Sequence, residues 1–400
     1  MSAQPFRSCV DNRPRRGAPR VERGSRSTSA PPPALHFHIN QASVPRIQRR
    51  RGRIQWDWAA RIGRDSGAQW YAVYWKILSL VALIAFAGAV YWAVSPVFRS
   101  QSADREDRQS VSVTPAGTPG PNDPVLVGAG DISSCAQEND SLTADLLDKV
   151  VASATGEVAV FTVGDNAYEN GTIEEYQQCY EPTWGRQKAR TRPVPGNHEY
   201  ASANADGYFE YYGAIAGDPA QGYYSYDLGG WHIIVLNTND HCQRVACSDA
   251  SPQAKWLRSD LEAHPVFCTL AIWHDPLFSS GRVHGSSQFV KPLWTLLYAA
   301  GADVVVNAHE HNYERFAPQT PDGAMDAEYG IREFVVGTGG ESHYRESDER
   351  LPNSEAANDD TFGVLRLTLH PSGYDWAFMP EERHGTFSDA GNGQCHGPPP

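Results

Sequence analysis

The 400-residue sequence lacks any pair of cysteines spaced as C-x-x-C and shows no internal repeat. It also lacks a serine, cysteine or aspartate in the setting of an activated nucleophile, which argues against a covalent intermediate on the protein. The missing cysteine pair argues against a thiolate zinc site. Methionine is scarce as well: none lies between Met1 and Met325, so an internal start site would need a non-standard codon.

Acidic residues are rare in the first 76 residues, where 15 Lys or Arg face 4 Asp or Glu, a net charge of +11. Since the whole chain carries −13, residues 77–400 carry −24. The Pro, Ser and Arg content of residues 1–76 is typical of a disordered arm. Nucleic-acid binding by residues 46–53 stays open, but no stacking or groove-reading motif supports it. The acidic remainder argues against a nucleic-acid partner, because it would repel a phosphate backbone.

A stretch of 22 residues without charge, residues 77–98, follows the basic arm. This length suffices to cross a bilayer, and Trp and Tyr residues near both ends resemble interfacial belts. We expect one transmembrane helix, with the arm in the cytoplasm and the acidic body outside it. A buried core helix is the alternative, although such a helix rarely lacks a polar face. Cleavage as a signal peptide also stays open and would make the body secreted.

Six of the seven cysteines lie beyond the apolar stretch, and only Cys9 lies in the arm. An even number in an exported body predicts three disulfides. Cys242 and Cys247 flank a short loop and are the favoured pair. We expect Cys135–Cys179 and Cys268–Cys395 for the others, but six cysteines allow many pairings, so these two stay open. Buried free thiols are the alternative.

Composition divides the rest of the chain into an exposed linker (99–123), a folded domain (124–383) and a Gly/Pro-rich surface tail (384–400). Strands are expected at 125–129, 158–163, 223–227, 232–236, 267–273, 304–306, 332–336, 364–369 and 374–378. Helices are expected around 142–152 and 173–179 and at 252–263, with Ser251 as the N-cap of the last. Early strand–helix alternation followed by β-rich sequence predicts two packed sheets flanked by helices.

Seven polar residues in five short blocks have the pattern of metal ligands, and most blocks follow a strand-like run. The blocks are G-A-G-D-I (Asp131), G-D-N-A-Y (Asp165, Tyr168), G-N-H-E (Asn197), A-I-W-H (His274) and N-A-H-E-H (His309, His311). Strand ends gather functional groups in α/β folds. Carboxylate and amide oxygens with imidazoles suit iron, manganese and zinc. Two such cations about 3.5–4 Å apart clamp the attacking and leaving oxygens of a displacement at phosphorus.

In this order the five blocks resemble the calcineurin-like metallophosphoesterases, and among them the purple acid phosphatase type, over residues 124–380. The resemblance implies a four-layer α-β-β-α sandwich and leaves no room for the N-terminal β domain of the plant enzymes. It also implies two ligand sets that share Asp165 as a bridge. One set is Asp131, Asp165, Tyr168 and His311; the other is Asp165, Asn197, His274 and His309.

Tyr168 distinguishes the purple type, in which the matching tyrosine binds ferric iron as a phenolate. The resemblance therefore implies Fe(III) beside a divalent Fe, Zn or Mn ion. A tyrosine that only packs on the loop 169–171 is the alternative. Ser133 stands where other metallophosphoesterases place a ligand histidine, which again favours the tyrosine-bearing group. Asn307 replaces the glycine usual before the last histidine pair, without loss of a ligand.

Two further histidines match residues that face the substrate in the family. His198 follows the asparagine ligand, and Glu199 is expected to orient its ring. His284 lies in G-R-V-H-G. Either histidine can serve as the general acid, while an exposed loop residue is the alternative for His284. Arg315 is expected to pair with Glu314 or a loop carboxylate, and the G-T-G-G stretch at 337–340 to form a tight turn.

These expectations combine into one function. The chain is expected to be a membrane-anchored, extracytoplasmic phosphatase that hydrolyses small phosphate monoesters with a metal-activated hydroxide. A phosphodiesterase or nucleotidase that uses the same site is the alternative. A silent binding or scaffold protein is disfavoured, because all seven ligand positions are filled.

Overall fold

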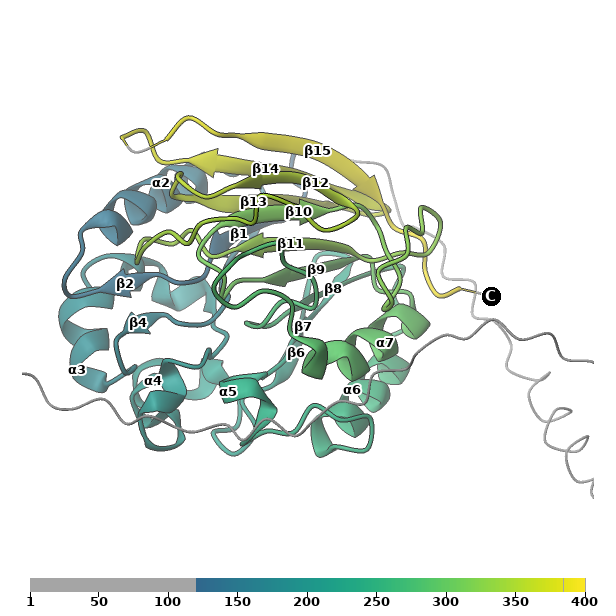
Figure 1. Ribbon diagram of the computed structural model, residues 1–400, viewed down its shortest axis with the longest axis horizontal. Coiled ribbons are helices and arrows are strands. Elements are labelled where there is room, and N and C mark those ends of the chain that lie inside the picture. The colour runs from purple at the N-terminus through teal and green to yellow at the C-terminus, as the bar shows by residue number, and fades with distance from the viewer. Residues whose placement is uncertain (1–119, 384, 400) are drawn as a thin grey trace, which may run out of the picture. The chain divides into compact units, whose positions relative to one another are not determined.

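Two β-sheets packed face to face form the centre of the described chain (Figure 1). The computed structural model describes residues 120–383 and 385–399. The expected arm, transmembrane helix and most of the linker therefore lie outside the described residues. Within the described ranges, no helix combines the length and apolarity needed to cross a bilayer.

The first sheet has the strand order β15-β14-β13-β1-β3-β5. β1, β3 and β5 are parallel, and β13, β14 and β15 join the other edge of β1 in antiparallel pairs. The strands are β1 (Val125–Ala129), β3 (Val158–Thr162), β5 (Thr191–Arg192), β13 (Gly363–His370), β14 (Gly373–Pro380) and β15 (Asp389–Gln394).

The second sheet has the order β12-β10-β11-β9-β8-β7-β6, with β7, β8, β9 and β11 parallel. Its strands are β6 (Tyr224–Leu228), β7 (Trp231–Val235), β8 (Cys268–Ile272), β9 (Val304–Asn307), β10 (Tyr313–Phe316), β11 (Arg332–Val336) and β12 (Ser354–Asn358). A two-stranded ribbon pairs β2 (Ser133–Ser134) with β4 (Ala167–Tyr168).

Helices cover the outer faces of both sheets. Along β7, Ile233 and Val235 belong to the core between the sheets, whereas Ile234 packs in a second apolar cluster with residues of α6 and α7. This alternation follows from the period of two in a strand. On the other side, α2 packs against β1 and β13. The mixed α/β fold is thus confirmed, in the layer order α-β-β-α (Figure 1).

The α-helices are α2 (Asn139–Ser153), α3 (Ile173–Glu175), α4 (Asp206–Tyr212), α5 (Asn239–Cys242), α6 (Pro252–Ala263) and α7 (Lys291–Ala300). Shorter helical turns are η1 (Tyr176–Tyr180), η2 (Trp184–Arg190), η3 (Glu199–Ala201), η4 (Ala203–Ala205), η5 (Gly213–Ala216) and η6 (Gln288–Val290). The bounds expected for α6 are those observed, and its N-cap is as expected, because the Ser251 hydroxyl accepts a hydrogen bond from the Ala254 N–H at 3.1 Å.

Part of the expected C-terminal tail is a strand instead. β15 pairs with β14 from Gly373↔Gln394 to Phe378↔Asp389 and forms the edge of the first sheet. Its sequence, D-A-G-N-G-Q, has no apolar alternation, so its place depends on main-chain hydrogen bonds rather than on burial. The following residue, Cys395, is bonded to Cys268 in β8 of the other sheet.

All three expected disulfides are confirmed. They join Cys242 to Cys247, Cys135 to Cys179 and Cys268 to Cys395, with Cα–Cα distances of 5.6, 5.2 and 5.4 Å. The last closes the longest loop, with a sequence separation of 127. In the chain-entropy account, such long closures restrict the unfolded chain most.

His232 forms a buried ion pair on β7, far in sequence from the ligand blocks. Its Nδ1 lies 2.9 Å from Asp227 Oδ1 and its Nε2 2.8 Å from Asp260 Oδ2. Burial alone would lower the pKa of His232, but the two carboxylates raise it above 6.5. Burial would raise the pKa of Asp260, but His232 and Ser225 lower it below 3.8.

We expect a His232→Gln variant to lose a pH-dependent part of its stability. Because the folded pKa of His232 is raised, the stability it contributes is fully present below pH 6.5 and is lost as the pH rises through the folded pKa. The difference in free energy of unfolding between wild type and variant should therefore shrink toward alkaline pH. Denaturant unfolding at pH 6 and pH 9 measures it, and a difference that grows toward pH 9 would contradict the ion pair.

Candidate metal centre

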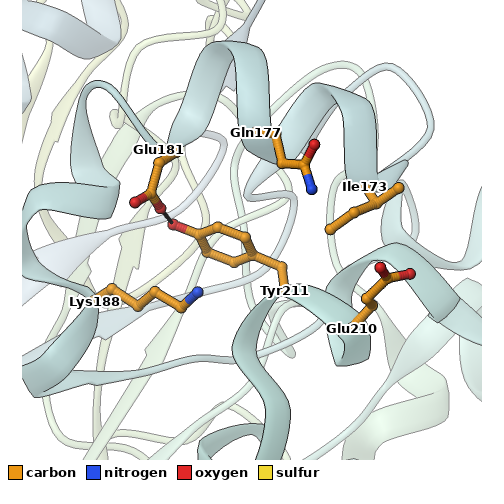
Figure 2. A pocket seen from close by; sticks show the side chains of 6 residues that line it. All are labelled: Ile173, Gln177, Glu181, Lys188, Glu210 and Tyr211. Carbon is orange, nitrogen blue, oxygen red and sulfur yellow. Dashed lines mark hydrogen bonds between the residues drawn. The ribbon is translucent and has the colours of Figure 1, made fainter.

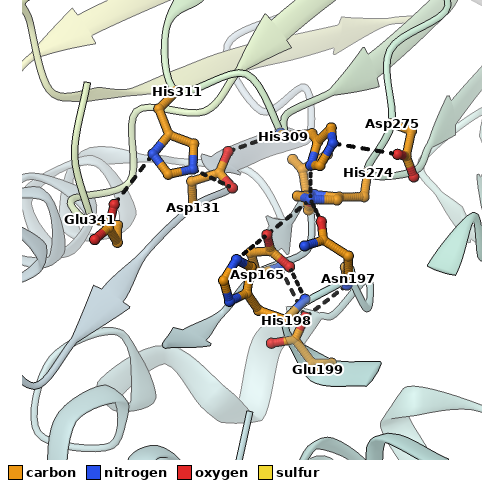
Figure 3. Close-up of polar contacts among 12 residues, drawn as sticks. Asp131, Asp165, Asn197, His198, Glu199, His274, Asp275, His309, His311 and Glu341 are labelled. Atoms are coloured by element: carbon orange, nitrogen blue, oxygen red, sulfur yellow. Dashed lines mark hydrogen bonds and ion pairs between the residues drawn. The ribbon is translucent and has the colours of Figure 1, made fainter. Parts of the chain in front are cut away.

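The seven expected ligands converge at one edge of the two sheets: Figure 3 labels six of them, and the Tyr168 hydroxyl bonds to Asp131 and Asp165 among these. Asp131 follows β1, Asp165 follows β3, His274 follows β8 and His309 follows β9. All four strands lie in parallel stretches of their sheets, so their carboxyl ends bring these side chains together. All seven positions lie in this cluster, and all but Asn197 are buried.

His274 is the centre of one group of donor atoms. Its Nδ1 lies 2.7 Å from the Val163 carbonyl, which can only accept, so Nδ1 carries the hydrogen. Its Nε2 lies 3.1 Å from Asp165 Oδ2, Asn197 Oδ1 and His309 Nδ1 alike. Lone pairs that face each other at this distance repel unless a proton or a cation lies between them. Although burial lowers the pKa of His274, the Asp165 carboxylate raises it to about 10 in the metal-free protein.

Tyr168 is the centre of a second group. Its hydroxyl lies 2.8 Å from Asp131 Oδ1, 3.3 Å from Asp165 Oδ2 and 3.3 Å from His311 Nε2. Burial and the Asp131 carboxylate raise the pKa of Tyr168 well above 10. A phenolate at this position therefore needs a cation beside it.

His311 directs its free nitrogen toward this second group. Its Nδ1 lies 2.8 Å from Ser342 Oγ and 3.3 Å from Glu341 Oε2. Because the Glu341 carboxylate accepts, Nδ1 holds a hydrogen and Nε2 faces Asp131 Oδ1 at 3.5 Å. A carboxylate behind a ligand histidine is a recurrent support in metal sites. Glu341 and Ser342 lie outside the five ligand blocks, so neither residue was expected at this site.

The donor set fits two cations. Asp165 Oδ2 belongs to both groups, and the side chains of Asp165, His274 and His309 lie close enough to share one ion. Hard oxygens and imidazole nitrogens are the donors that iron, zinc and manganese accept. Asp165 is thus suited to bridge, since one carboxylate between two cations offsets their repulsion.

The backbone is unusual at three of these positions. Asp131, Asp165 and His309 have φ values of 55°, 50° and 71°, in the left-handed region that side chains rarely adopt. Such conformations persist only where surrounding bonds impose them, and they cluster at functional sites. Here the His309 N–H donates to Asp131 Oδ2 at 2.9 Å, which links two of the three.

Glu199 has a different role from the one expected, because its side chain does not orient the His198 ring. Instead its carboxylate accepts from the N–H groups of Asp165 (2.9 Å), Asn166 (2.8 Å) and Gly196 (2.7 Å). The Ala167 N–H donates a longer bond at 3.4 Å, and the Tyr176 hydroxyl donates a fifth at 2.9 Å. Glu199 therefore joins the loop of Asp165 to the loop of Asn197.

His198 lies at the open side of the cluster, with 30% of its side chain exposed. Its Nδ1 lies 2.6 Å from the Glu169 carbonyl, and its ring packs on Tyr168 with centroids 4.3 Å apart. Nε2 lies 4.0 Å from Asp165 Oδ2. Burial favours the neutral ring, but the Asp165 charge and the Glu169 carbonyl raise the pKa of His198.

His284 also reaches the cluster, where it contacts His309 rather than Tyr168. Its ring stacks on His309, with centroids 3.9 Å apart and an angle of 29°. Burial lowers its pKa.

The loop 337–340, for which only a tight turn was expected, also contacts the site. A Cβ at Gly337 would lie 2.5 Å from Asp131 Oδ2, so this position has no room for a side chain.

Arg315 pairs with residues outside the ligand cluster. It pairs with Asp389 of β15 at 2.7 Å and with Glu355 of β12, not with Glu314. Glu314 instead accepts hydrogen bonds from the N–H and hydroxyl of Ser280. Arg315 therefore joins edge strands of the two sheets.

A separate hollow of about 360 Å³ lies beside α3, η1 and α4 and contains none of the seven residues (Figure 2). Three of its polar groups contact one another: the Tyr211 hydroxyl donates to Glu181, and the Lys188 ammonium lies 3.8 Å from the centre of the Tyr211 ring. No histidine lines this pocket, so the combined imidazole and carboxylate donors lie in the strand-end cluster.

Comparison with known proteins agrees with this site. The model of the calcineurin-like phosphoesterase family matches residues 126–313. Purple acid phosphatase 15 of Arabidopsis thaliana is 28% identical over 39% of this chain and 35% of its own length. Purple acid phosphatase 21 of the same plant is 31% identical over 48% of each. The chain thus spans about a third to a half of the length of these relatives.

Among solved structures, a purple acid phosphatase from yellow lupin (Lupinus luteus) seeds shares the fold. Its TM-score is 0.55 and its identity 18%, over 68% of this chain and 55% of the other. The family model, the curated relatives and the shared fold agree with the five ligand blocks. Residues 126–313 of the chain therefore match the calcineurin-like phosphoesterase family, and the curated relatives to which the chain is similar are purple acid phosphatases.

Proposed function

We propose that this protein hydrolyses phosphate monoesters at a dinuclear metal centre formed by the seven clustered residues. The observation that carries the proposal is the pair of donor groups that meet at Asp165 Oδ2. One ion would be held by Asp131, Asp165, Tyr168 and His311, and the other by Asp165, Asn197, His274 and His309. Fe(III) in the first set and divalent iron, zinc or manganese in the second fit the donor chemistry.

Bound cations supply Lewis acidity at the phosphoryl group and lower the pKa of water. The chain itself supplies proton handling. The Glu169 carbonyl accepts from His198 Nδ1, so Nε2 is the nitrogen that holds or releases a proton toward the substrate. The raised pKa of His198 favours the cationic ring, which can donate to a phosphoryl or leaving oxygen. His284 stacks on His309 and is the second candidate for this role.

Turnover of the full-length, metal-loaded chain with p-nitrophenyl phosphate, bis(p-nitrophenyl) phosphate and a nucleotide tests the proposal. We expect kcat/KM for the monoester to exceed that for the diester by about tenfold or more. The opposite ratio would move the function to a phosphodiesterase, and a preference for the nucleotide to a nucleotidase. Absence of hydrolysis with all three would sink the proposal.

Replacing Tyr168 by phenylalanine should remove a visible charge-transfer band while the fold is kept. The hydroxyl is the only part removed, and it is the phenolate oxygen that a ferric ion would share with Asp131 and His311. Absorption spectra and circular dichroism of the two proteins measure this. A band that survives in Tyr168→Phe would show that another residue is the chromophoric ligand.

We further propose that the catalytic domain, residues 124–383, acts outside the cytoplasm. The three disulfides support an oxidising compartment. The apolar stretch 77–98 would then be its single-pass anchor, or a leader if it is cleaved. A small phosphate ester is the partner that such a site takes.

A further inference from the structure

The loop that carries His284 is held by carboxylates rather than by regular secondary structure. Residues 277–285 lie between β8 and η6, and three buried glutamates accept their main-chain N–H groups. Glu333 accepts from Leu277 (3.1 Å) and Phe278 (3.3 Å), Glu314 from Ser280 (2.8 Å), and Glu310 from Val283 (2.9 Å), His284 (2.7 Å) and Gly285 (3.2 Å).

Glu310 makes the contacts at the end of the loop nearest the metal centre. It is fully buried and lies between His309 and His311 in sequence. While the two histidines face the donor groups, the Glu310 carboxylate faces the loop. One carboxylate that accepts three N–H groups forms charge-assisted bonds, which are stronger than neutral ones.

The close approach of Glu310 also explains a glycine in the loop. A Cβ at Gly281 would lie 2.0 Å from Glu310 Cγ, so any larger residue would displace the carboxylate or the loop. The loop also bonds to residues 345–347, because the Arg282 N–H donates to the Arg345 carbonyl at 3.3 Å and the Ser347 N–H to the Ser280 carbonyl at 2.9 Å, while 55% of Val283 is exposed. Glu310 thus fixes the loop at His284 and at the residue on either side of it.

We propose that Glu310 is a positioning residue, which fixes the loop 283–285 so that the His284 ring lies over His309 and faces the substrate. The inference rests on the proposed function for the role of His284, but the contact between Glu310 and the loop does not. Stacking of His284 on His309 at 3.9 Å shows that the loop reaches the ligand cluster. Loss of the three hydrogen bonds would let the ring leave that position.

The first test is hydrogen–deuterium exchange in full-length Glu310→Gln, which keeps the shape of the side chain but not its charge. Because an amide nitrogen cannot accept a hydrogen bond, the N–H groups that bond to one of the two carboxylate oxygens lose their acceptor. We expect the amides of residues 283–285 to exchange about tenfold faster or more. Exchange equal to wild type would overturn the proposal. This readout does not require any enzymatic activity.

Glu333→Gln is the matched control, since it changes a buried glutamate that binds the same loop farther from His284. Only Oε1 of Glu333 accepts, from Leu277 and Phe278, and Oε2 has no hydrogen-bond partner within the described residues. Glutamine keeps the accepting oxygen. We expect exchange at 283–285 and turnover as in wild type, and equal loosening in both variants would contradict a specific role for Glu310.

The second test combines Glu310→Gln with His284→Ala. If Glu310 acts through His284, the single change lowers kcat/KM about tenfold or more, and the same change in the His284→Ala protein has little further effect. Metal content should stay at the wild-type value throughout. Additive losses, or metal loss without faster loop exchange, would assign Glu310 to support of His309 and His311 and overturn the proposal. If wild type lacks turnover, the proposed function fails while the exchange experiment still decides the loop contact.

Discussion

Asp165→Asn should lower kcat/KM by about a thousandfold or more, the scale of losing a main electrostatic contribution to a transition state. It should also remove at least one metal ion per chain. The reason is that Asp165 Oδ2 lies 3.1 Å from His274 Nε2 and 3.3 Å from the Tyr168 hydroxyl, so a single oxygen serves both donor groups. A neutral amide there no longer offsets the repulsion between two cations.

Turnover and elemental analysis of the same preparation measure this prediction. Asp303→Asn is the control, because Asp303 is also a buried aspartate of the second sheet, but lies just before β9 and accepts main-chain N–H groups from Thr269 and His396. It should keep both metal ions and turnover. Full activity with two ions in Asp165→Asn would remove the bridge from the account.

Glu199→Ala should destabilise the fold by about 3 kcal/mol or more, because several buried donors would lose their acceptor at once. The donors are the N–H groups of Asp165, Asn166, Ala167 and Gly196 and the Tyr176 hydroxyl. Metal affinity should fall as well, since these bonds join the loops of Asp165 and Asn197. Denaturant unfolding of the metal-free protein separates the first effect from the second.

Tyr176→Phe is the matched variant for this prediction. It removes one of the five donors and leaves the four N–H groups paired with Glu199. The expected loss is about 1 kcal/mol, with unchanged metal content. If Glu199→Ala unfolded at the same denaturant concentration as Tyr176→Phe, the carboxylate would not be the junction that we describe.

The strands and the convergence of the seven polar residues were predictable because both leave local signals. Asp131 and His309 each follow the end of a buried strand by two residues, and strand ends converge in parallel sheets. Helix α6 was predictable from its N-cap Ser251. Helix α7 was missed although Leu293, Trp294 and Leu297 have helical spacing and Gly301 ends it with φ 81°.

The supporting carboxylates were not predictable in the same way. Glu310 contacts a loop that lies 25–27 residues earlier, and Glu199 contacts amides 33 and 34 residues earlier. Neither contact follows from a periodic pattern in the sequence, so no local signal indicates the partners of Glu310 or Glu199. Strand β15 was not predicted for another reason: it is held by main-chain pairing, which leaves no apolar pattern in the sequence.

The most direct test of the central claim is the metal content of the purified full-length chain, measured together with its visible spectrum. From the proposed dinuclear centre we expect two ions per chain, one of them iron, and an absorption band that depends on Tyr168. Two ions without iron or colour would keep the bridged centre but remove Tyr168 as a ferric ligand. One ion or none, in a folded protein that turns over phosphate esters, would contradict the dinuclear centre.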